Sequence, residues 1–259
     1  MNLSGNTVLI TGGSAGIGLA LAAALAGRGN TVIITGRSQT KLAEAKAAHP
    51  ALHTRVCDVG DEAAVRALTA ELTQSHPDLN VLVNNAGVMS NWRVDDGIEG
   101  LAFLESEVAT NFSGPVRLTA LLLPHLRTRP NAAVVNVTSG VIYGAMPDAS
   151  IYGATKAALH AFTAALRMQL HGSGVRVVEL IPPTVETAMS TGRFEKQKNG
   201  LFGVEVLTTE QFVAHTLTGL ERGDEEIRVG QAGIMYWARR FAPGILDAQL
   251  RKLTSVRPE

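Results

Sequence analysis

Short apolar runs alternate with longer segments of helical periodicity along almost the whole chain. The apolar runs predict strands at residues 7–10, 31–35, 53–56, 81–83, 133–137, 175–180 and 226–229. The segments between them predict helices, for example at residues 40–48, 62–74, 101–126, 151–169 and 209–220. Because strands and helices alternate throughout and the strands are nearly all apolar, the pattern indicates an α/β fold. We expect one doubly wound, parallel sheet of about seven strands with helices on both faces.

No linker, low-complexity segment or internal repeat interrupts this pattern, so we predict one domain over residues 1–230. A helical extension is expected over residues 231–259, where apolar residues alternate with basic ones. This extension allows three interpretations, namely a helix lying on a membrane, a subunit contact or a cover over a pocket. We favour packing within the core or between subunits over membrane contact.

The first predicted strand leads into a glycine-rich turn, Thr11-Gly12-Gly13-Ser14-Ala15-Gly16-Ile17-Gly18, and a predicted helix follows. Glycines let the backbone approach a ligand, and the free N–H groups at a helix start suit a pyrophosphate. The turn therefore predicts a dinucleotide site. It also fits G-x-S-x-G, the turn that presents a hydrolase's nucleophilic serine, here Ser14. We favour the dinucleotide site because only about ten residues precede the turn, too few for the strands before a hydrolase elbow.

Charge and cysteine content narrow the classes of function. The formal net charge is zero and the isoelectric point is near 7.1, so there is no basic field to hold nucleic acid. The single cysteine, Cys57, excludes an intramolecular disulfide and fits a reducing compartment, so we expect a cytoplasmic protein with this thiol buried. The apolar stretch 9–26 has no basic segment before it and contains glycines, so we predict a strand and a helix rather than a targeting segment.

Polar motifs follow several predicted strands, where a parallel sheet places its ligand site. Asn84-Asn85-Ala86-Gly87 follows the fourth strand, Ser139 follows the fifth, and Tyr152 and Lys156 open the next helix. Because Tyr152 and Lys156 are four residues apart, they lie on one helix face, where the ammonium lowers the pKa of the phenol. A hydroxyl such as that of Ser139 can orient a carbonyl beside the phenol. Each motif alone is weak, but together they indicate proton transfer to a carbonyl that receives a hydride.

In this combination the chain resembles the short-chain dehydrogenase/reductase family over roughly residues 3–229. The resemblance implies a Rossmann-type domain in which Tyr152 is the general acid/base. It further implies that Lys156 lowers the pKa of Tyr152 and holds the nicotinamide ribose, while Ser139 positions the substrate oxygen. Asn111 would keep a water that links Lys156 to solvent. Taken alone, Asn111 also fits an ordinary polar position of its helix.

The resemblance also implies a nicotinamide dinucleotide cofactor, with Gly12, Gly16 and Gly18 along the pyrophosphate and Asp58 at the adenine ring. Taken alone, Asp58 also fits a helix cap. Pro183 stands where the family has glycine, which removes a backbone N–H from the loop that carries the contact implied for Thr187. The full set assigned to the cofactor is Thr11, Gly12, Ser14, Gly16, Ile17, Gly18, Arg37, Asp58, Val59, Asn85, Ala86, Gly87, Tyr152, Lys156, Pro182, Val185 and Thr187. No metal ligands are assigned.

The end of the second strand favours NADP(H) over NAD(H). NAD sites place an acid here for the ribose 2′-OH, whereas an arginine accommodates the 2′-phosphate of NADP. Gly36 stands at the position of the acid and Arg37 follows it, with Ser14 as a further hydroxyl. The alternative is that Arg37 is a solvated loop cation.

Residues 188–202 are polar, with glycines and basic residues, and by resemblance form a lid over the substrate; an ordinary surface loop is the alternative. Tyr143, Met146, Met189 and Phe202 are candidates for an apolar pocket wall. The helices predicted at 101–126 and 151–169 resemble those that pair subunits in the family, so a homodimer or homotetramer is expected. Segments 114–124 and 182–187 look loosely similar to bacterial short-chain oxidoreductases encoded with lipoteichoic-acid D-alanylation genes.

We therefore predict an NADP(H)-dependent oxidoreductase that interconverts a small-molecule carbonyl and an alcohol. The alternative from another class is a non-catalytic regulatory module that senses the NADPH/NADP ratio. Ser139, Tyr152 and Lys156 favour the enzyme, because a sensor needs none of them.

Overall fold

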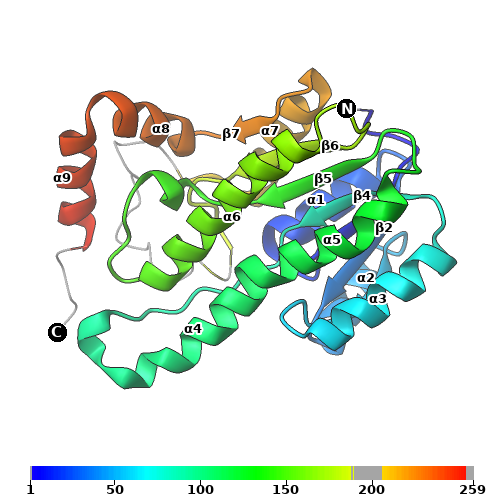
Figure 1. The fold of residues 1–259 in the computed structure, drawn as a ribbon, viewed down its shortest axis with the longest axis horizontal. Coiled ribbons are helices and arrows are strands. Elements are labelled where there is room, and N and C mark those ends of the chain that lie inside the picture. Colours follow the sequence, from blue (N-terminus) through cyan, green and yellow to red (C-terminus); the bar gives the residue numbers. More distant parts are fainter. Residues whose placement is uncertain (1, 188, 190–205, 255–259) are drawn as a thin grey trace.

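The computed structural model describes residues 2–187, 189 and 206–254. Within them, seven parallel strands form one sheet in the order β3-β2-β1-β4-β5-β6-β7 (Figure 1). The strands are β1 (Thr7–Thr11), β2 (Thr31–Gly36), β3 (His53–Val56), β4 (Leu79–Asn84), β5 (Ala133–Val137), β6 (Arg176–Ile181) and β7 (Glu226–Arg228). The strand order reverses between β1 and β4, which is where ligands bind in open α/β sheets. The predicted fold class is confirmed.

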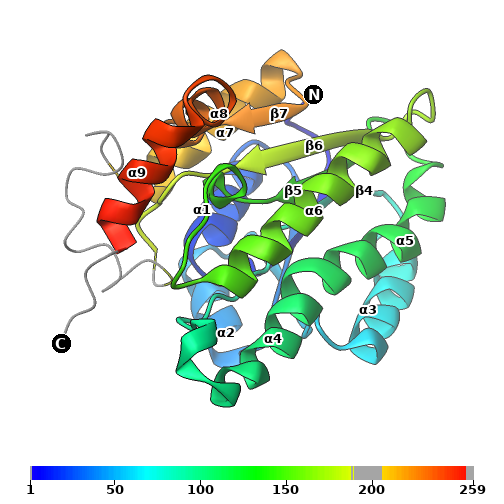
Figure 2. The same ribbon diagram turned by 60° about the vertical axis from the view of Figure 1, so that its left-hand side comes forward.

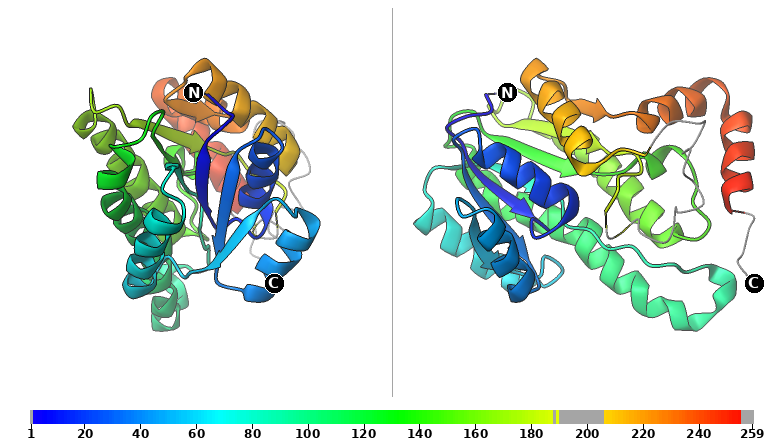
Figure 3. Two further views of the ribbon diagram at one scale, coloured as in Figure 1. Left: turned by 90° about the vertical axis from the view of Figure 1, so that its right-hand side faces the viewer. Right: turned by 180° about the vertical axis from the view of Figure 1, so that it is seen from behind.

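Helices cover both faces of the sheet (Figures 2 and 3). Apolar residues of α1, α2 and α7 pack in one core cluster, and those of α3, α5 and α6 pack in another on the opposite face. The helices are α1 (Gly16–Ala26), α2 (Gln39–Ala48), α3 (Glu62–Ser75), α4 (Leu101–Val108), α5 (Gly114–Leu126), α6 (Ser150–Gln169), α7 (Thr209–Arg222), α8 (Gln231–Phe241) and α9 (Pro243–Thr254). Among the described residues, no helix combines the length and apolar character needed to cross a membrane.

The stretch predicted as a helix at 101–126 is helical throughout, but its hydrogen bonding changes in the middle, which the sequence did not predict. A π-helical turn, η3 (Ala109–Ser113), separates α4 from α5 and contains Asn111, which is fully buried. Such a turn adds a residue to the helical repeat and is frequent at functional sites. Immediately after it, a Cβ built on Gly114 would lie 2.5 Å from the carbonyl oxygen of Val59, so a side chain there would force α5 away from the loop that follows β3.

The extension after residue 230 is helical where it is described. α8 ends at Phe241 and α9 begins at Pro243, whose fixed φ fits the first turn of a helix. Met235 and Leu246 pack with Tyr143 and Ile181 in a third apolar cluster, at the carboxyl edge of the sheet. The domain boundary at residue 230 stays a prediction.

Candidate active site

A cavity of about 420 Å³ lies at the carboxyl ends of β1, β2, β4 and β5. Most residues assigned from the sequence line it: Gly12, Ser14, Gly16, Ile17, Gly18, Arg37, Asp58, Val59, Asn85, Ala86, Gly87, Tyr152, Lys156, Pro182 and Thr187. The lining also contains Ala15, Ser38, Lys41, Val88, Thr110, Val137 and Thr138, which were not predicted from the sequence. All of them except Lys41 and Thr110 adjoin the motifs at strand ends, and that position is the signal that could have found them, whereas Lys41 and Thr110 lie in helices.

The glycine turn forms a cradle at one end of the cavity. Gly12 and Gly16 have φ values of +65° and +54°, a region that side-chain-bearing residues rarely adopt. A Cβ on Gly18 would lie 2.4 Å from both Asn85 Nδ2 and the Gly12 carbonyl oxygen. The first turn of α1 receives no side-chain cap from Ala15, so its N–H groups suit an external anion. The cradle therefore fits a pyrophosphate.

Four polar residues surround the end of β2. Ser14, Arg37, Ser38 and Lys41 line the cavity there, and a Cβ on Gly36 would lie 3.0 Å from Ser14 Oγ. The Ser38 side chain accepts a hydrogen bond from the Lys41 N–H at 3.2 Å and caps α2. The positive end of the α2 helix dipole therefore also lies near the end of β2. Hydroxyls, two cations and a helix start are the groups that recognise a phosphate. No histidine is among the described lining residues, so Ser14 has no hydrolase base there.

Two predicted cofactor residues serve the scaffold instead of lining the cavity. Thr11 is 1% exposed, and its hydroxyl accepts hydrogen bonds from the Asn85 and Ala86 N–H groups, both at 3.0 Å. Asn85 Nδ2 in turn donates to the Thr11 carbonyl at 2.9 Å, so these residues join β1 to β4. Val185 is buried in the core cluster and forms a bridge with Leu207.

Asp58 lines the cavity, and its carboxylate accepts a hydrogen bond from the Gly60 N–H at 2.9 Å, which shapes the turn after β3. Cys57 beside it is 4% exposed. Burial, together with the nearby charges of Asp58 and Asp61, raises the pKa of the Cys57 thiol to about 11. The thiol is therefore protonated near neutral pH and unreactive.

Tyr152 and Lys156 lie in the first turns of α6. The Lys156 ammonium is 5.7 Å from the centroid of the Tyr152 ring and donates to the Val137 carbonyl at 2.8 Å. It is 4% exposed, and burial lowers its pKa from 10.5 to about 8. Gly87 faces this ammonium, since a Cβ there would lie 3.6 Å from Lys156 Nζ and 3.5 Å from Asn111 Oδ1. The structure thus brings residues from the loop after β4, from η3 and from α6 to one point.

Asn111 connects the loop after β4 to α6, the helix that carries Tyr152 and Lys156. Its Oδ1 accepts from the Val88 N–H at 2.8 Å, and its Nδ2 donates to the Val88 carbonyl at 2.8 Å and to Thr155 Oγ1 at 3.1 Å. The Thr155 hydroxyl donates to the Tyr152 carbonyl at 2.8 Å. The π-helical turn therefore places Asn111 where it holds the Tyr152 backbone.

Ser139 follows β5 and caps the short helix η4 (Gly140–Tyr143) by accepting a long hydrogen bond, 3.4 Å, from the Val141 N–H. It is 9% exposed, as is Tyr152. Of the wall candidates, Met189 lines the cavity, whereas the ring of Tyr143 packs edge-on against Tyr236 in the C-terminal cluster. The predicted lid at 188–202, apart from Met189, lies outside the described residues.

Comparison with known proteins agrees with this geometry. A family model described as short chain dehydrogenase matches residues 6–198. The chain is 45% identical over 227 residues to the uncharacterized oxidoreductase DltE of Bacillus subtilis (strain 168), a match that covers 88% of this chain and 89% of that protein.

Two solved structures share the fold. A short chain dehydrogenase from Burkholderia cenocepacia J2315 in complex with NADP has a TM-score of 0.82 and 24% identity, covering 96% of this chain and 99% of the other. The 3-ketoacyl-(acyl-carrier-protein) reductase of Brucella melitensis complexed with NADH has a TM-score of 0.75 and 25% identity, covering 84% and 91%.

A parallel sheet with a glycine cradle and a buried Tyr–Lys pair defines an oxidoreductase of the Rossmann type. The chain belongs to the short-chain dehydrogenase/reductase family, related to the DltE oxidoreductase, as its sequence motifs predicted. It is an enzyme of the class that acts on CH–OH and C=O groups with a nicotinamide cofactor.

Proposed function

We propose that the chain uses NADP(H) to interconvert a carbonyl and an alcohol, with Tyr152 as the general acid/base. The observation that carries this proposal is one continuous cavity, which joins the glycine cradle at Gly12–Gly18 to Tyr152 and Lys156. Such an arrangement holds a long dinucleotide at one end and leaves its reactive end beside a phenol. The assembled catalytic residues favour an enzyme over a regulatory module.

The nicotinamide ring supplies or accepts the hydride when it is bound. Tyr152 gives its hydroxyl proton to the substrate oxygen during reduction and removes a proton from the alcohol during oxidation. Lys156 places a positive charge beside the phenol, which favours the phenolate. Ser139 holds the substrate oxygen by a hydrogen bond, and Asn111 keeps the helix that carries Tyr152 in place.

The preference for NADP(H) rests on Ser14, Arg37 and Lys41 around the end of β2. Guanidinium and ammonium groups bind a phosphate strongly, and no acidic side chain stands at Gly36 to bind a free 2′-OH. One structural neighbour carries NADP and another carries NADH, so the fold accommodates both and these side chains decide between them.

A homodimer or homotetramer is the proposed assembly. Leu101, Phe103, Leu104 and Val108 on α4 are 37–47% exposed, and Val94 and Ile98 in the preceding turns are more exposed still. A patch of this kind marks an interaction surface. We also propose a cytoplasmic location, because a single cysteine fits a reducing compartment.

The test is NADPH oxidation, followed by its nicotinamide absorbance, against a panel of ketones, aldehydes, quinones and 3-oxoacyl thioesters, with NADH in parallel. We expect turnover of at least one class and a higher kcat/KM with NADPH. Tighter binding of NADH than of NADPH in a direct titration contradicts the cofactor assignment. Tight NADPH binding without turnover of any substrate class contradicts the carbonyl reaction and favours the non-catalytic module that senses the NADPH/NADP ratio.

A further inference from the structure

A carboxylate lies inside the sheet next to the catalytic residues. Glu179 stands in the middle of β6 between apolar neighbours, and its exposed fraction is 0%. Burying a carboxylate is strongly unfavourable unless it is paired and hydrogen-bonded. An apolar residue would fill this position of a buried strand at lower cost, so the contacts of Glu179 require an explanation.

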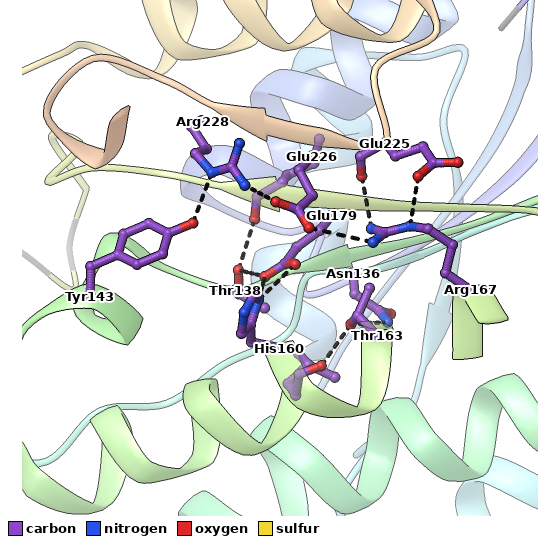
Figure 4. Close-up of polar contacts among 12 residues, drawn as sticks. Asn136, Thr138, Tyr143, His160, Thr163, Arg167, Glu179, Glu225, Glu226 and Arg228 are labelled. Atoms are coloured by element: carbon purple, nitrogen blue, oxygen red, sulfur yellow. Dashed lines mark hydrogen bonds and ion pairs between the residues drawn. The ribbon is translucent and has the colours of Figure 1, made fainter. Parts of the chain in front are cut away.

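Glu179 has two hydrogen-bonding partners on different elements (Figure 4). The Thr138 hydroxyl donates to its Oε1 at 2.6 Å, and His160 Nδ1 lies 2.9 Å from both carboxylate oxygens. The nearby arginines have other partners, because Arg167 pairs with Glu225 and Glu226, and Arg228 pairs with Glu226.

These partners adjoin the two catalytic hydroxyls. Thr138 directly precedes Ser139 and itself lines the cavity. His160 lies four residues after Lys156 and eight after Tyr152, on the same side of α6. Glu179, which belongs to a third element, therefore bridges the segment that carries Ser139 and the helix that carries Tyr152.

Three further hydrogen bonds also hold the Ser139 segment, residues 137–143, in place. The Lys156 ammonium binds the Val137 carbonyl, and the Gly140 N–H donates to the Pro182 carbonyl at 2.8 Å. At the far end of η4, the Tyr143 hydroxyl accepts from Arg228 Nε at 3.0 Å. Of these contacts, only the one through Glu179 and His160 joins the Ser139 segment to α6 by side chains alone.

We propose that Glu179 and His160 are a positioning pair that sets the separation between Ser139 and Tyr152. This inference rests on the proposed function, in which both hydroxyls meet one substrate oxygen. Displacements of an ångström between reacting groups lower rates by about a hundredfold. A residue that fixes this separation acts on the rate of the reaction and leaves the cofactor cradle unchanged.

The test compares three variants in the full-length protein. Glu179→Leu removes both bonds, and Thr138→Val removes the bond from the Thr138 hydroxyl to Glu179, together with its longer contact of 3.3 Å to the Leu180 carbonyl. Glu179→Gln keeps an acceptor for Thr138 and gives His160 an amide partner. We expect kcat to fall about tenfold or more in the first two variants, with KM and the Kd for NADPH within about twofold, and we expect Gln to restore most of kcat.

Thr163→Val is the matched control. It removes another buried hydroxyl of α6, which accepts from Asn136 Nδ2 at 2.9 Å, one turn beyond His160. This variant loses a helix-to-sheet bond of the same kind that reaches β5 before Thr138 and does not pass through Glu179, so kcat is expected to stay near the wild-type value. Wild-type kcat in Glu179→Leu, or an equal fall in Thr163→Val, overturns the proposal.

Amide hydrogen exchange of the cofactor-free protein separates this proposal from the proposed function. Glu179→Leu should speed exchange in residues 138–143, and Thr163→Val should not. If the wild type reduces no carbonyl, the proposed function fails, and exchange still decides whether Glu179 holds this segment. Unchanged exchange at 138–143 in Glu179→Leu overturns the positioning role.

Discussion

At the scale of single residues, the buried charge of Lys156 destabilises the folded protein. Its ammonium is buried with one carbonyl partner, and burial lowers its pKa to about 8. Because the folded-state pKa lies below the unfolded value, the charge destabilises the fold below about pH 8. This cost disappears as the pH rises toward 10.5, where lysine is losing its charge in the unfolded state as well. The site thus keeps a destabilising charge beside the Tyr152 ring, where the proposed proton transfer would use it.

Replacing Lys156 with Met should stabilise the cofactor-free protein while abolishing turnover. The pKa difference corresponds to on the order of 3 kcal/mol at pH 7, since one pKa unit is about 1.4 kcal/mol. The gain should shrink as the pH rises from about 8 to about 10, and urea unfolding of both proteins at the two ends of a range from pH ~7 to ~10 measures it. If the gain in the free energy of unfolding is the same at both pH values, this account of Lys156 is contradicted.

The cofactor cavity is built at the scale of elements, from strand ends and helix starts that glycines bring into contact. Gly18 lies against Asn85 and the Gly12 carbonyl, so β1, α1 and β4 meet without room for a methyl group. Gly36 lies close to Ser14, since a Cβ there would be 3.0 Å from Ser14 Oγ. The shape of the cavity therefore depends on glycine at positions 18 and 36.

Gly18→Ala should abolish NADPH binding, because its Cβ would overlap backbone and an amide that supports the turn. Gly27→Ala is the control at the other end of α1, where a Cβ meets its nearest atoms at 3.5 Å, an ordinary contact. Fluorescence titration of NADPH measures both. Binding of near wild-type affinity in Gly18→Ala would contradict the assignment of the cradle.

Gly36→Asp should shift the cofactor preference toward NADH. The new carboxylate would stand beside Ser14 and Arg37, where it repels a 2′-phosphate and accepts a bond from a 2′-OH. We expect the ratio of NADPH to NADH affinity to fall about tenfold or more. Gly36→Ala, which adds the Cβ without the charge, separates steric from electrostatic effects. An equal change in both variants would show that the effect is steric and would contradict the predicted effect of the carboxylate's charge.

Across the whole molecule, the elements that depend on local pattern could be predicted from the sequence. The strands and most helices follow from apolar periodicity, and the cradle follows from its glycines. The π-helical turn at Asn111 left no signal, because it changes the hydrogen bonding of an otherwise continuous helix. Lys41 was missed because one lysine in a helix usually faces solvent, and only the spatial end of β2 places it at the cavity.

A row of polar side chains across the sheet could not be predicted from the sequence either. Asn84, Asn136, Glu179 and Glu226 stand at matching register on β4, β5, β6 and β7. In the sequence each of them lies in or beside an apolar run, and its partners lie about forty or fifty positions away. Register between strands, which depends on the assembled sheet, is what makes them a row.

The central claim is that Tyr152 transfers the proton in a reaction driven by NADP(H). The most direct measurement compares wild type and Tyr152→Phe on one carbonyl that the wild type reduces, with the Kd for NADPH determined in parallel. We expect a fall in kcat of about a hundredfold or more, with NADPH affinity within about twofold of wild type. Turnover retained by Tyr152→Phe at tight NADPH binding would contradict the claim.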